Sequence, residues 1–170
     1  NGQDTLALYE MVGSTGQVVA FDIQSQALLA TSERLISAGA QVRLQQQDIQ
    51  PLQRQLGIDL LKMSHAELTT VVPASPKGII ANLGYLPGGR QDLVTRPEST
   101  LWALEQSCSL LADGGRLAVV VYPGHPGGAE EGAAVTNFFT ELQDLKFQVL
   151  QMSVSNRPQA PFLCVVEKQS

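Results

Sequence analysis

Short apolar runs alternate with helix-like segments along almost the whole chain, and this alternation restricts the fold more than any other feature. The apolar runs read as buried strands and lie at residues 18–22, 58–63, 78–82, 116–122, 147–154 and 162–167. The segments between them have apolar residues at helical spacing and lie at residues 3–12, 24–38, 67–72, 98–111 and 133–145. No helix separates the last two strands. This order predicts a doubly wound α/β sheet with helices on both faces and a closing antiparallel hairpin.

The stretch between residues 40 and 57 is the ambiguous part of this pattern. Residues 41–45 alternate like a strand, and the Gln-rich residues 45–57 could hold a short helix. Residues 58–63 are the better apolar run, so we expect them to be the sheet strand and 40–57 to be a local excursion. In the preceding helix, the expected inner face consists of Ala27, Leu28, Leu35 and Ile36.

Composition limits the class of protein. The 170 residues are 44% hydrophobic and 16% charged, which is typical of one globular domain over residues 1–170 and argues against disorder. No apolar run approaches the roughly 20 residues of a membrane span. The two cysteines, Cys108 and Cys164, lie in apolar segments and look like core thiols without metal or redox spacing. We therefore expect neither a membrane segment nor a metal site.

The formal net charge of −5 restricts how such a chain could bind nucleic acid. Proteins that grip long nucleic acids through their phosphates are normally basic. An RNA substrate would therefore be recognised locally, or by residues outside this chain.

Polar side chains follow two of the predicted strands directly. Asp22 ends the first strand, about 20 residues after the glycine-bearing turn of a nucleotide-binding βαβ unit, where a carboxylate accepts hydrogen bonds from ribose hydroxyls. The first strand of that unit would lie upstream of Asn1. Ser64 and His65 follow the strand at 58–63. His65 fits either a structural role or a contact with a cofactor.

Residues 82–89 read Asn-Leu-Gly-Tyr-Leu-Pro-Gly-Gly and follow a short apolar strand. A polar amide at the end of a buried strand, followed by turn residues, suits a rigid loop over a ligand, because open α/β sheets bind ligands beyond the carboxyl ends of their strands. The alternative is a tight turn in which Asn82 ties down backbone groups. Asn82 and Tyr85 also resemble the Asn-Pro-Pro-Tyr loop of amine-directed methyltransferases. A comparable loop, Tyr-Pro-Gly-His-Pro-Gly-Gly, occupies residues 122–128.

Together these motifs resemble one family closely, the tRNA 5-aminomethyl-uridine methyltransferases that were first labelled "putative rRNA methylases". The matching segments span nearly the whole chain and lie at residues 1–5, 21–24, 64–65, 82–89, 121–127 and 157–162. Three differences from the family pattern matter. The Asp-Ala-Thr-x-Gly that precedes Asn-Gly in the family is absent, Gln3 stands where His is usual, and the stretch at 40–57 is longer.

The resemblance implies a Rossmann-like class I methyltransferase that uses S-adenosyl-L-methionine to N-methylate the aminomethyl group of a modified wobble uridine in tRNA. It implies a cofactor site formed by Asn1, Gly2, Asp4, Thr5, Asp22, Gln24, Ser64, His65 and Asn82. Asn82 would also orient the amine, and Tyr85 would shape the methyl channel. His125 is the best candidate for the proton acceptor, because neutral imidazole can accept a proton at cellular pH. The alternative role for His125 is a hydrogen bond that ties its loop.

If the sheet is wound as expected, the substrate-binding set at the mouth of the pocket consists of Leu86, Pro87, Gly88, Gly89, Arg90, Arg96, Tyr122 and Arg157. We expect its three arginines to form a small basic rim for phosphates of the tRNA anticodon loop, and the alternative is ordinary surface charge. The expected location is the cytoplasm, or an organelle such as the chloroplast if the source is a plant. A homodimer is left open. Rival functions are methylation of rRNA or of a small-molecule amine, and a catalytically idle binding module with the cofactor fold.

Overall fold

The computed structural model describes residues 2–72, 75–83, 97–124, 126–157 and 159–170. Contacts divide the chain into two compact units, Asn1–Ala74 and Ser75–Ser170, and each unit is described here by itself. The sequence predicts one domain over the whole chain and a further strand upstream of Asn1, and both statements stay predictions.

The first unit contains a parallel sheet of β1 (Gln17–Phe21), β2 (Val42–Gln45) and β3 (Gly57–Leu61), in the order β1-β3-β2. All residues of β3 are buried, which confirms that this apolar run is the main sheet strand. Describing 40–57 only as a local excursion was wrong, because β2 pairs with β3 from Val42 to Gln45. Its alternating residues are half-buried, as expected of a strand at the edge of a sheet.

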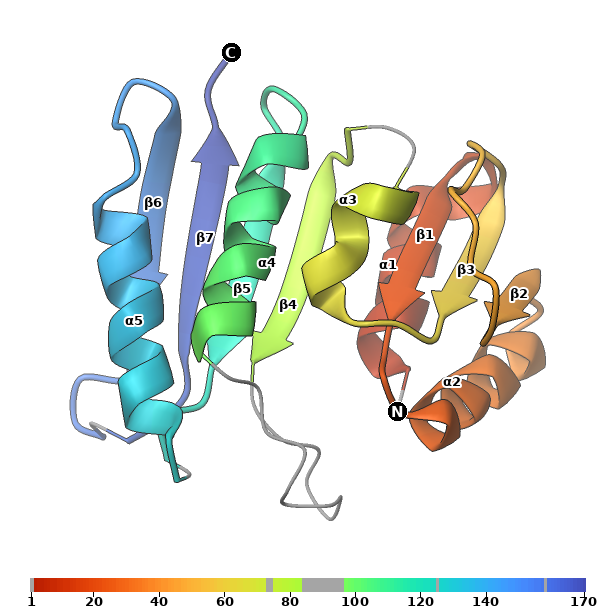
Figure 1. Ribbon diagram of the computed structural model, residues 1–170, viewed down its shortest axis with the longest axis horizontal. Helices are drawn as coiled ribbons and strands as arrows, with labels where there is room; N and C mark the ends of the chain where they lie inside the picture. The colour runs from red at the N-terminus through yellow and green to blue at the C-terminus, as the bar shows by residue number, and fades with distance from the viewer. Residues whose placement is uncertain (1, 73–74, 84–96, 125, 158) are drawn as a thin grey trace. The chain divides into compact units, whose positions relative to one another are not determined.

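Helices α1 (Gln3–Val12) and α2 (Ser25–Ser37) cover one face of this sheet, where Val18, Ile58 and Leu60 pack against Leu28 and Leu35 (Figure 1). The other face packs Leu61 against Leu52 of the irregular 46–56 segment and against Val71 of the short helix α3 (Leu68–Val71). The inner face of α2 differs from the expected one at one position, because Ile36 is 60% exposed and Thr31 is buried instead. Thr31 continues the row of Ala27, Leu28 and Leu35 at helical spacing, whereas Ile36 lies beside it.

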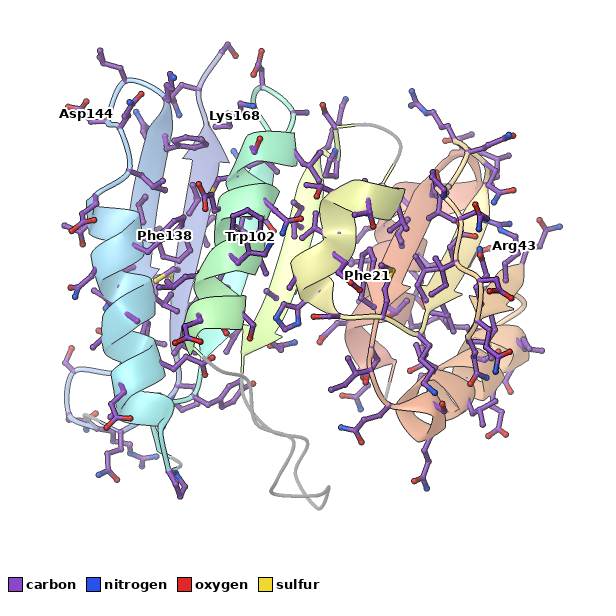
Figure 2. All side chains as sticks on the ribbon, in the orientation of Figure 1. Phe21, Arg43, Trp102, Phe138, Asp144 and Lys168 are labelled. Carbon is purple, nitrogen blue, oxygen red and sulfur yellow. The ribbon has the colours of Figure 1, made fainter. Side chains whose placement is uncertain are left out.

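A buried carboxylate, Asp59, lies in the middle of β3 and is fully shielded from solvent. Arg43 of β2 donates from Nε to Asp59 Oδ1 at 2.7 Å and from Nη2 to Oδ2 at 2.9 Å. Gln17 Nε2 donates to Oδ2 at 2.8 Å, and Arg43 Nη1 donates to the Leu56 carbonyl at 2.9 Å. The hydrogen bond to Asp59 raises the pKa of Arg43, while burial lowers it and the charge of Asp59 raises it further. Through Arg43, which is labelled in Figure 2, this cluster therefore joins the sheet to the end of the 46–56 segment.

The second unit contains a sheet of β4 (Gly78–Leu83), β5 (Arg116–Val121), β7 (Phe162–Lys168) and β6 (Phe147–Met152), in that spatial order. β4 and β5 are parallel, whereas β7 runs antiparallel to both β5 and β6. The predicted antiparallel closing hairpin is thus confirmed, with its second strand inserted between β5 and its first strand.

Helices α4 (Pro97–Leu110) and α5 (Gly128–Thr140) lie on the same face of this sheet (Figure 1). The core between the helices and the sheet is formed by Leu104, Cys108, Leu111, Leu117, Val119, Val121, Val135, Phe139, Cys164 and Val166. The predicted bounds of the helix at 133–145 were wrong, because α5 begins at Gly128 and ends at Thr140. Gly127 is the residue before the helix and has a left-handed backbone (φ 82°). The negative charges of the glutamates in the first turn interact favourably with the positive end of the helix dipole.

Both cysteines are buried and free, as expected of core thiols. Burial raises the pKa of Cys108 to about 11 against the opposing effect of the Lys168 charge, and burial also raises the pKa of Cys164. Because the thiolate is the reactive form, we expect neither thiol of the folded protein to react with a disulfide reagent at pH 8. Both should react once urea unfolds the chain, and fast labelling of the folded protein would contradict this burial.

The raised pKa of Cys108 also has a consequence for stability. The folded state holds this proton more tightly than the unfolded state, whose thiol titrates near the ordinary value of 9.0. The contribution of the thiol to stability is therefore fully present below pH 9.0 and is lost as the pH rises through about 11.

Candidate functional site

Asp22 lies at the carboxyl end of β1, on the rim where the sequence predicts it. Its backbone N–H donates to the carbonyl of Leu61 at 3.1 Å, so the carboxyl ends of β1 and β3 lie side by side. The Gln24 backbone N–H donates to Asp22 Oδ1 at 2.8 Å and forms a tight turn before α2. This bond fixes the half-buried carboxylate, and no described residue donates a further hydrogen bond to Oδ2. One oxygen thus remains available as a hydrogen-bond acceptor for a ligand.

Gly2 lies at the start of α1 in a left-handed backbone conformation, with φ at 74°. Gly2 has no side chain that could cap the helix, and the positive end of the α1 dipole lies at this residue. A Cβ atom at Gly2 would lie 2.8 Å from Thr31 Cγ2 and 3.0 Å from Thr31 Cα of α2. The glycine therefore allows both the backbone conformation and the close approach of α1 to α2.

Replacing Gly2 with alanine should destabilise the first unit more than the same change at Gly13. Both glycines have positive φ, but a Cβ atom at Gly13 would meet nothing within 4 Å. Backbone strain alone should cost Gly13→Ala roughly 1–2 kcal/mol, and overpacking against Thr31 should add roughly 1–3 kcal/mol to Gly2→Ala. Urea titration followed by circular dichroism measures the difference. Equal unfolding midpoints would show that the contact with Thr31 relaxes freely.

Ser64 and His65 follow β3 on the same rim of the first unit. Ser64 caps a short 3₁₀ turn, His65–Glu67, by accepting a hydrogen bond at Oγ from the Ala66 N–H at 3.2 Å. His65 is half-buried, and its Nε2 atom is shielded from solvent. Asp4 and Thr5 lie in the first turn of α1, with Asp4 exposed and Thr5 half-buried. The first unit thus holds Gly2, Asp4, Thr5, Asp22, Gln24, Ser64 and His65.

The second unit brings three other predicted residues to one rim of its sheet. Asn82 lies opposite Val120 near the carboxyl end of β4, and its side chain is exposed. Tyr122 directly follows β5 and is 41% exposed. Arg157 lies in the loop between β6 and β7, which begins and ends on this rim because Val121 pairs with Phe162.

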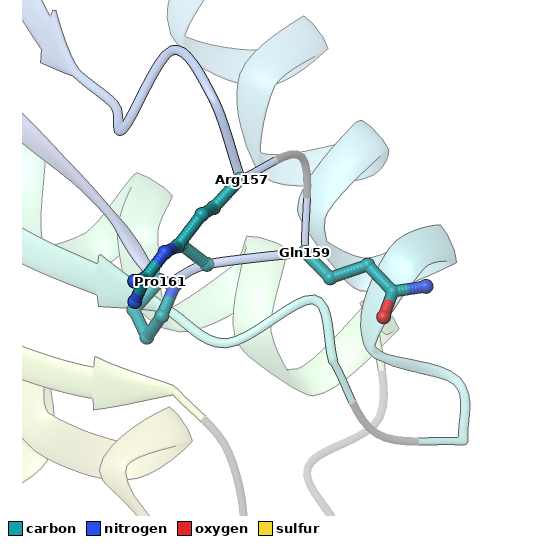
Figure 3. Close-up of a pocket in the computed structure, with 4 residues that line it drawn as sticks. Arg157, Gln159 and Pro161 are labelled. Carbon is teal, nitrogen blue, oxygen red and sulfur yellow. The ribbon is translucent and has the colours of Figure 1, made fainter.

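The loop that carries Arg157 packs against the loop that follows β5. A Cβ atom at Gly124 would lie only 3.2 Å from the carbonyl oxygen of Gln159. The Arg157 carbonyl accepts a hydrogen bond from the Ala160 N–H at 2.9 Å, which closes a turn. Arg157, Gln159, Ala160 and Pro161 line an open cavity of about 630 Å³ beside these loops (Figure 3). A guanidinium on such a cavity suits a phosphate or another anionic group.

The remaining predicted site residues lie outside the described residues. They are Asn1, Tyr85, Leu86, Pro87, Gly88, Gly89, Arg90, Arg96 and His125. Their roles stay predictions.

The sequence interpretation missed one buried polar pair near this rim. Thr100 of α4 and Glu131 of α5 are buried and share a hydrogen bond. A signal for it was present in the sequence. Thr100 lies four residues before Leu104, and Glu131 lies four residues before Val135, so both polar residues fall on the apolar rows of their helices.

Two absences are limited to the described ranges. Among the residues described, His, Cys, Asp and Glu side chains form no group of three or more that could hold a metal ion. Within the same ranges, every helix is too short or too polar to cross a membrane.

Comparisons with known proteins agree with this architecture. The chain is 35% identical over 176 residues to the Arabidopsis thaliana protein named tRNA (mnm(5)s(2)U34)-methyltransferase, chloroplastic. The match covers 99% of this chain and 60% of that relative, so the chain spans less than two thirds of the relative's length.

Solved structures with related sequences have the same fold. A "putative rRNA-methylase" from Clostridium thermocellum superposes with a TM-score of 0.85 and 32% identity, over 98% of this chain and 83% of its own. A "putative methyltransferase" from Streptococcus mutans, solved in complex with SAH, has a TM-score of 0.73 and 33% identity, over 89% of this chain and 76% of its own. The fold is thus that of class I methyltransferases, as predicted. The model of one protein family matches residues 18–168, and the chain belongs to that family, described as "Putative rRNA methylase".

Proposed function

We propose that the chain forms the catalytic domain of an S-adenosylmethionine-dependent methyltransferase that N-methylates the aminomethyl group of a modified wobble uridine in tRNA. The observation that carries this proposal is the oriented Asp22 carboxylate at the carboxyl end of β1, in a chain 35% identical to a tRNA methyltransferase. The Streptococcus mutans protein, which is 33% identical to this chain, was solved with SAH, the demethylated form of this cofactor.

The residues of the first unit fit such a cofactor. Asp22 Oδ2 accepts no hydrogen bond from the residues that the structure describes and can accept one from a ribose hydroxyl, while Oδ1 is held by the Gln24 N–H. The start of α1 presents the positive end of its helix dipole, which suits the carboxylate of an amino-acid group. Gly2 contributes no side chain to obstruct that approach. We assign the amino-acid group to Asn1, Gly2, Asp4 and Thr5, and the adenine side to Ser64 and His65.

When bound, S-adenosylmethionine supplies an electrophilic methyl group on a sulfonium. The protein must hold the amine nitrogen in line with that methyl group, and correct orientation can lower the barrier by several kcal/mol. The amine must also be unprotonated, because an ammonium has no lone pair. We assign the orientation of the amine to Asn82, the shape of the methyl channel to Tyr85, and the acceptance of the amine proton to His125.

Methyl transfer from labelled S-adenosylmethionine to tRNA tests this function directly. The whole protein is incubated with tRNA that carries 5-aminomethyl-2-thiouridine at the wobble position, and the nucleosides are then identified by mass spectrometry. We expect the label in the methylaminomethyl nucleoside. Because the family description names rRNA, ribosomal RNA is tested in parallel. Label in rRNA alone would overturn the tRNA assignment, and absence of cofactor binding would favour an idle binding module.

Substrate recognition by the basic rim can be tested separately. Replacing Arg90, Arg96 and Arg157 with glutamine should weaken tRNA binding and flatten its salt dependence, which we expect to have a log–log slope of roughly −2 for phosphate contacts of this number. The affinity for S-adenosylmethionine should not change. The control replaces the exposed residues Arg54, Lys77 and Lys146 with glutamine and removes the same charge. If both variants lose the same affinity for tRNA, the three arginines of the rim act only as ordinary surface charges.

The partner and location follow from the same proposal. The tRNA anticodon loop is the macromolecular partner, and no observation in the described residues favours a homodimer. Since the Arabidopsis relative is named as chloroplastic, we propose an organelle such as the chloroplast if the source is a plant, and otherwise the cytoplasm.

A further inference from the structure

A buried hydrogen bond joins the first turns of α4 and α5. Thr100 Oγ1 donates to Glu131 Oε1 at 2.7 Å across 31 residues of sequence. Thr100 is fully buried, and Glu131 is 3% exposed. The two side chains therefore form a direct polar link between helices that are far apart in the chain.

An apolar core also holds the two helices together. α4 and α5 already share an apolar core through Leu104, Cys108, Val135 and Phe139. Burying a carboxylate is costly, and apolar side chains of similar size often hold two elements together equally well or better. A buried carboxylate that contacts a hydroxyl at this place therefore points to a role besides cohesion.

The location of the bond indicates that role. α4 begins at Pro97, where the segment that follows β4 ends, and α5 begins at Gly128, where the loop that follows β5 ends. These connections contain Tyr85 and His125, which we assign to the methyl-accepting side. The residue after Glu131 also contacts the sheet, since a Cβ atom at Gly132 would lie 3.5 Å from side-chain atoms of Val121 and Phe162. Val121 directly precedes Tyr122.

We propose that Thr100 and Glu131 are positioning residues for methyl transfer. Their hydrogen bond fixes the spacing between the starts of α4 and α5, and with it the end points of the two connections that carry the residues for the methyl acceptor. This inference rests on the proposed function. It predicts that loss of the bond slows transfer while the folded protein and its cofactor affinity persist, because the ribose contact of Asp22 lies in the first unit.

The decisive variant is T100V/E131M in the whole protein. It removes both polar groups and leaves no unpaired charge, so its melting temperature should equal or exceed that of the parent. We expect kcat for tRNA methylation to fall about tenfold or more, since small displacements of reacting groups are costly. The KM for tRNA and the dissociation constant for S-adenosylmethionine should remain within about twofold of the parent values.

Two further variants separate positioning from general packing. T100S keeps the hydroxyl and should retain most of the parent kcat. S107A removes another buried hydroxyl of α4, whose Oγ donates to the Ala103 carbonyl at 2.7 Å within the same helix, and should leave kcat unchanged. T100V alone and E131M alone complete a double-mutant cycle, in which the two losses of kcat should not add.

The outcomes are distinguishable. An active parent whose folded T100V/E131M variant keeps the parent kcat would overturn the positioning role and leave the proposed function intact. Equal losses of kcat in S107A and T100V/E131M would also overturn it, because the effect would then belong to the packing of α4. A parent protein that binds S-adenosylmethionine but methylates no RNA would overturn the proposed function, and the inference with it.

Discussion

Replacing Arg43 with methionine is expected to lower the free energy of unfolding by roughly 3–5 kcal/mol, because it leaves a buried carboxylate without its charged partner. Asp59 is fully buried in the central strand of the first unit, and Arg43 supplies two of its hydrogen bonds, at 2.7 and 2.9 Å. Gln17 remains but is neutral. Urea titration of the whole protein, followed by circular dichroism, measures the change.

A surface ion pair provides the matched control. Arg116 Nε donates to Glu167 Oε2 at 2.8 Å, but the Arg116 side chain is 68% exposed. Arg116→Met should therefore cost at most about 1 kcal/mol. Adding Asp59→Asn to Arg43→Met should recover much of the lost stability, because no buried charge then remains. If Arg43→Met and Arg116→Met had equal effects, the Arg43–Asp59 pair would contribute no more than a surface pair.

Replacing Asp22 with asparagine should weaken the binding of S-adenosylmethionine about tenfold or more. Asparagine keeps the shape and the oxygen that accepts from the Gln24 N–H, so the turn before α2 should persist. It loses the charge, and hydrogen bonds to charged groups contribute roughly 1.5–3 kcal/mol, which corresponds to about a tenfold change or more in affinity.

Isothermal calorimetry on the whole protein measures this change. Asp48→Asn is the control, because Asp48 is exposed, lies outside the proposed site and has a left-handed backbone that asparagine tolerates. Melting temperatures of both variants should stay close to that of the parent. If Asp22→Asn binds the cofactor as tightly as the parent does, the ribose contact lies elsewhere.

Elements with strong local signals were predicted closely from the sequence. The bounds of α1, Gln3–Val12, match the expected helix because apolar spacing and the glycine at position 13 both define them. The strand that directly precedes Asp22 and the strand that contains Asn82 were also located correctly. Each is a compact apolar run between turn residues, and such a run is readily identified as a strand. The rim positions of these polar residues follow from the strands.

Features that depend on distant partners could not be predicted in the same way. The start of α5 was missed because two glycines read as loop, whereas Gly127 serves as a cap and Gly128 begins the helix. The role of β2 depends on its pairing with β3 and on the salt bridge between Arg43 and Asp59, which no local pattern reveals. The contact of Thr100 with Glu131 likewise depends on the packing of two helices.

The position of β7 between β5 and β6 has a consequence for synthesis of the protein on the ribosome. β7 is later in sequence than both of its neighbours, so β6 has no partner in the described sheet until residues 162–168 have been made. Until then the nascent chain presents unpaired edges of β5 and β6, and such edges promote association between chains. This sheet is therefore completed only after β7 has been synthesised, and a nascent chain stalled before Phe162 is a natural substrate for chaperones.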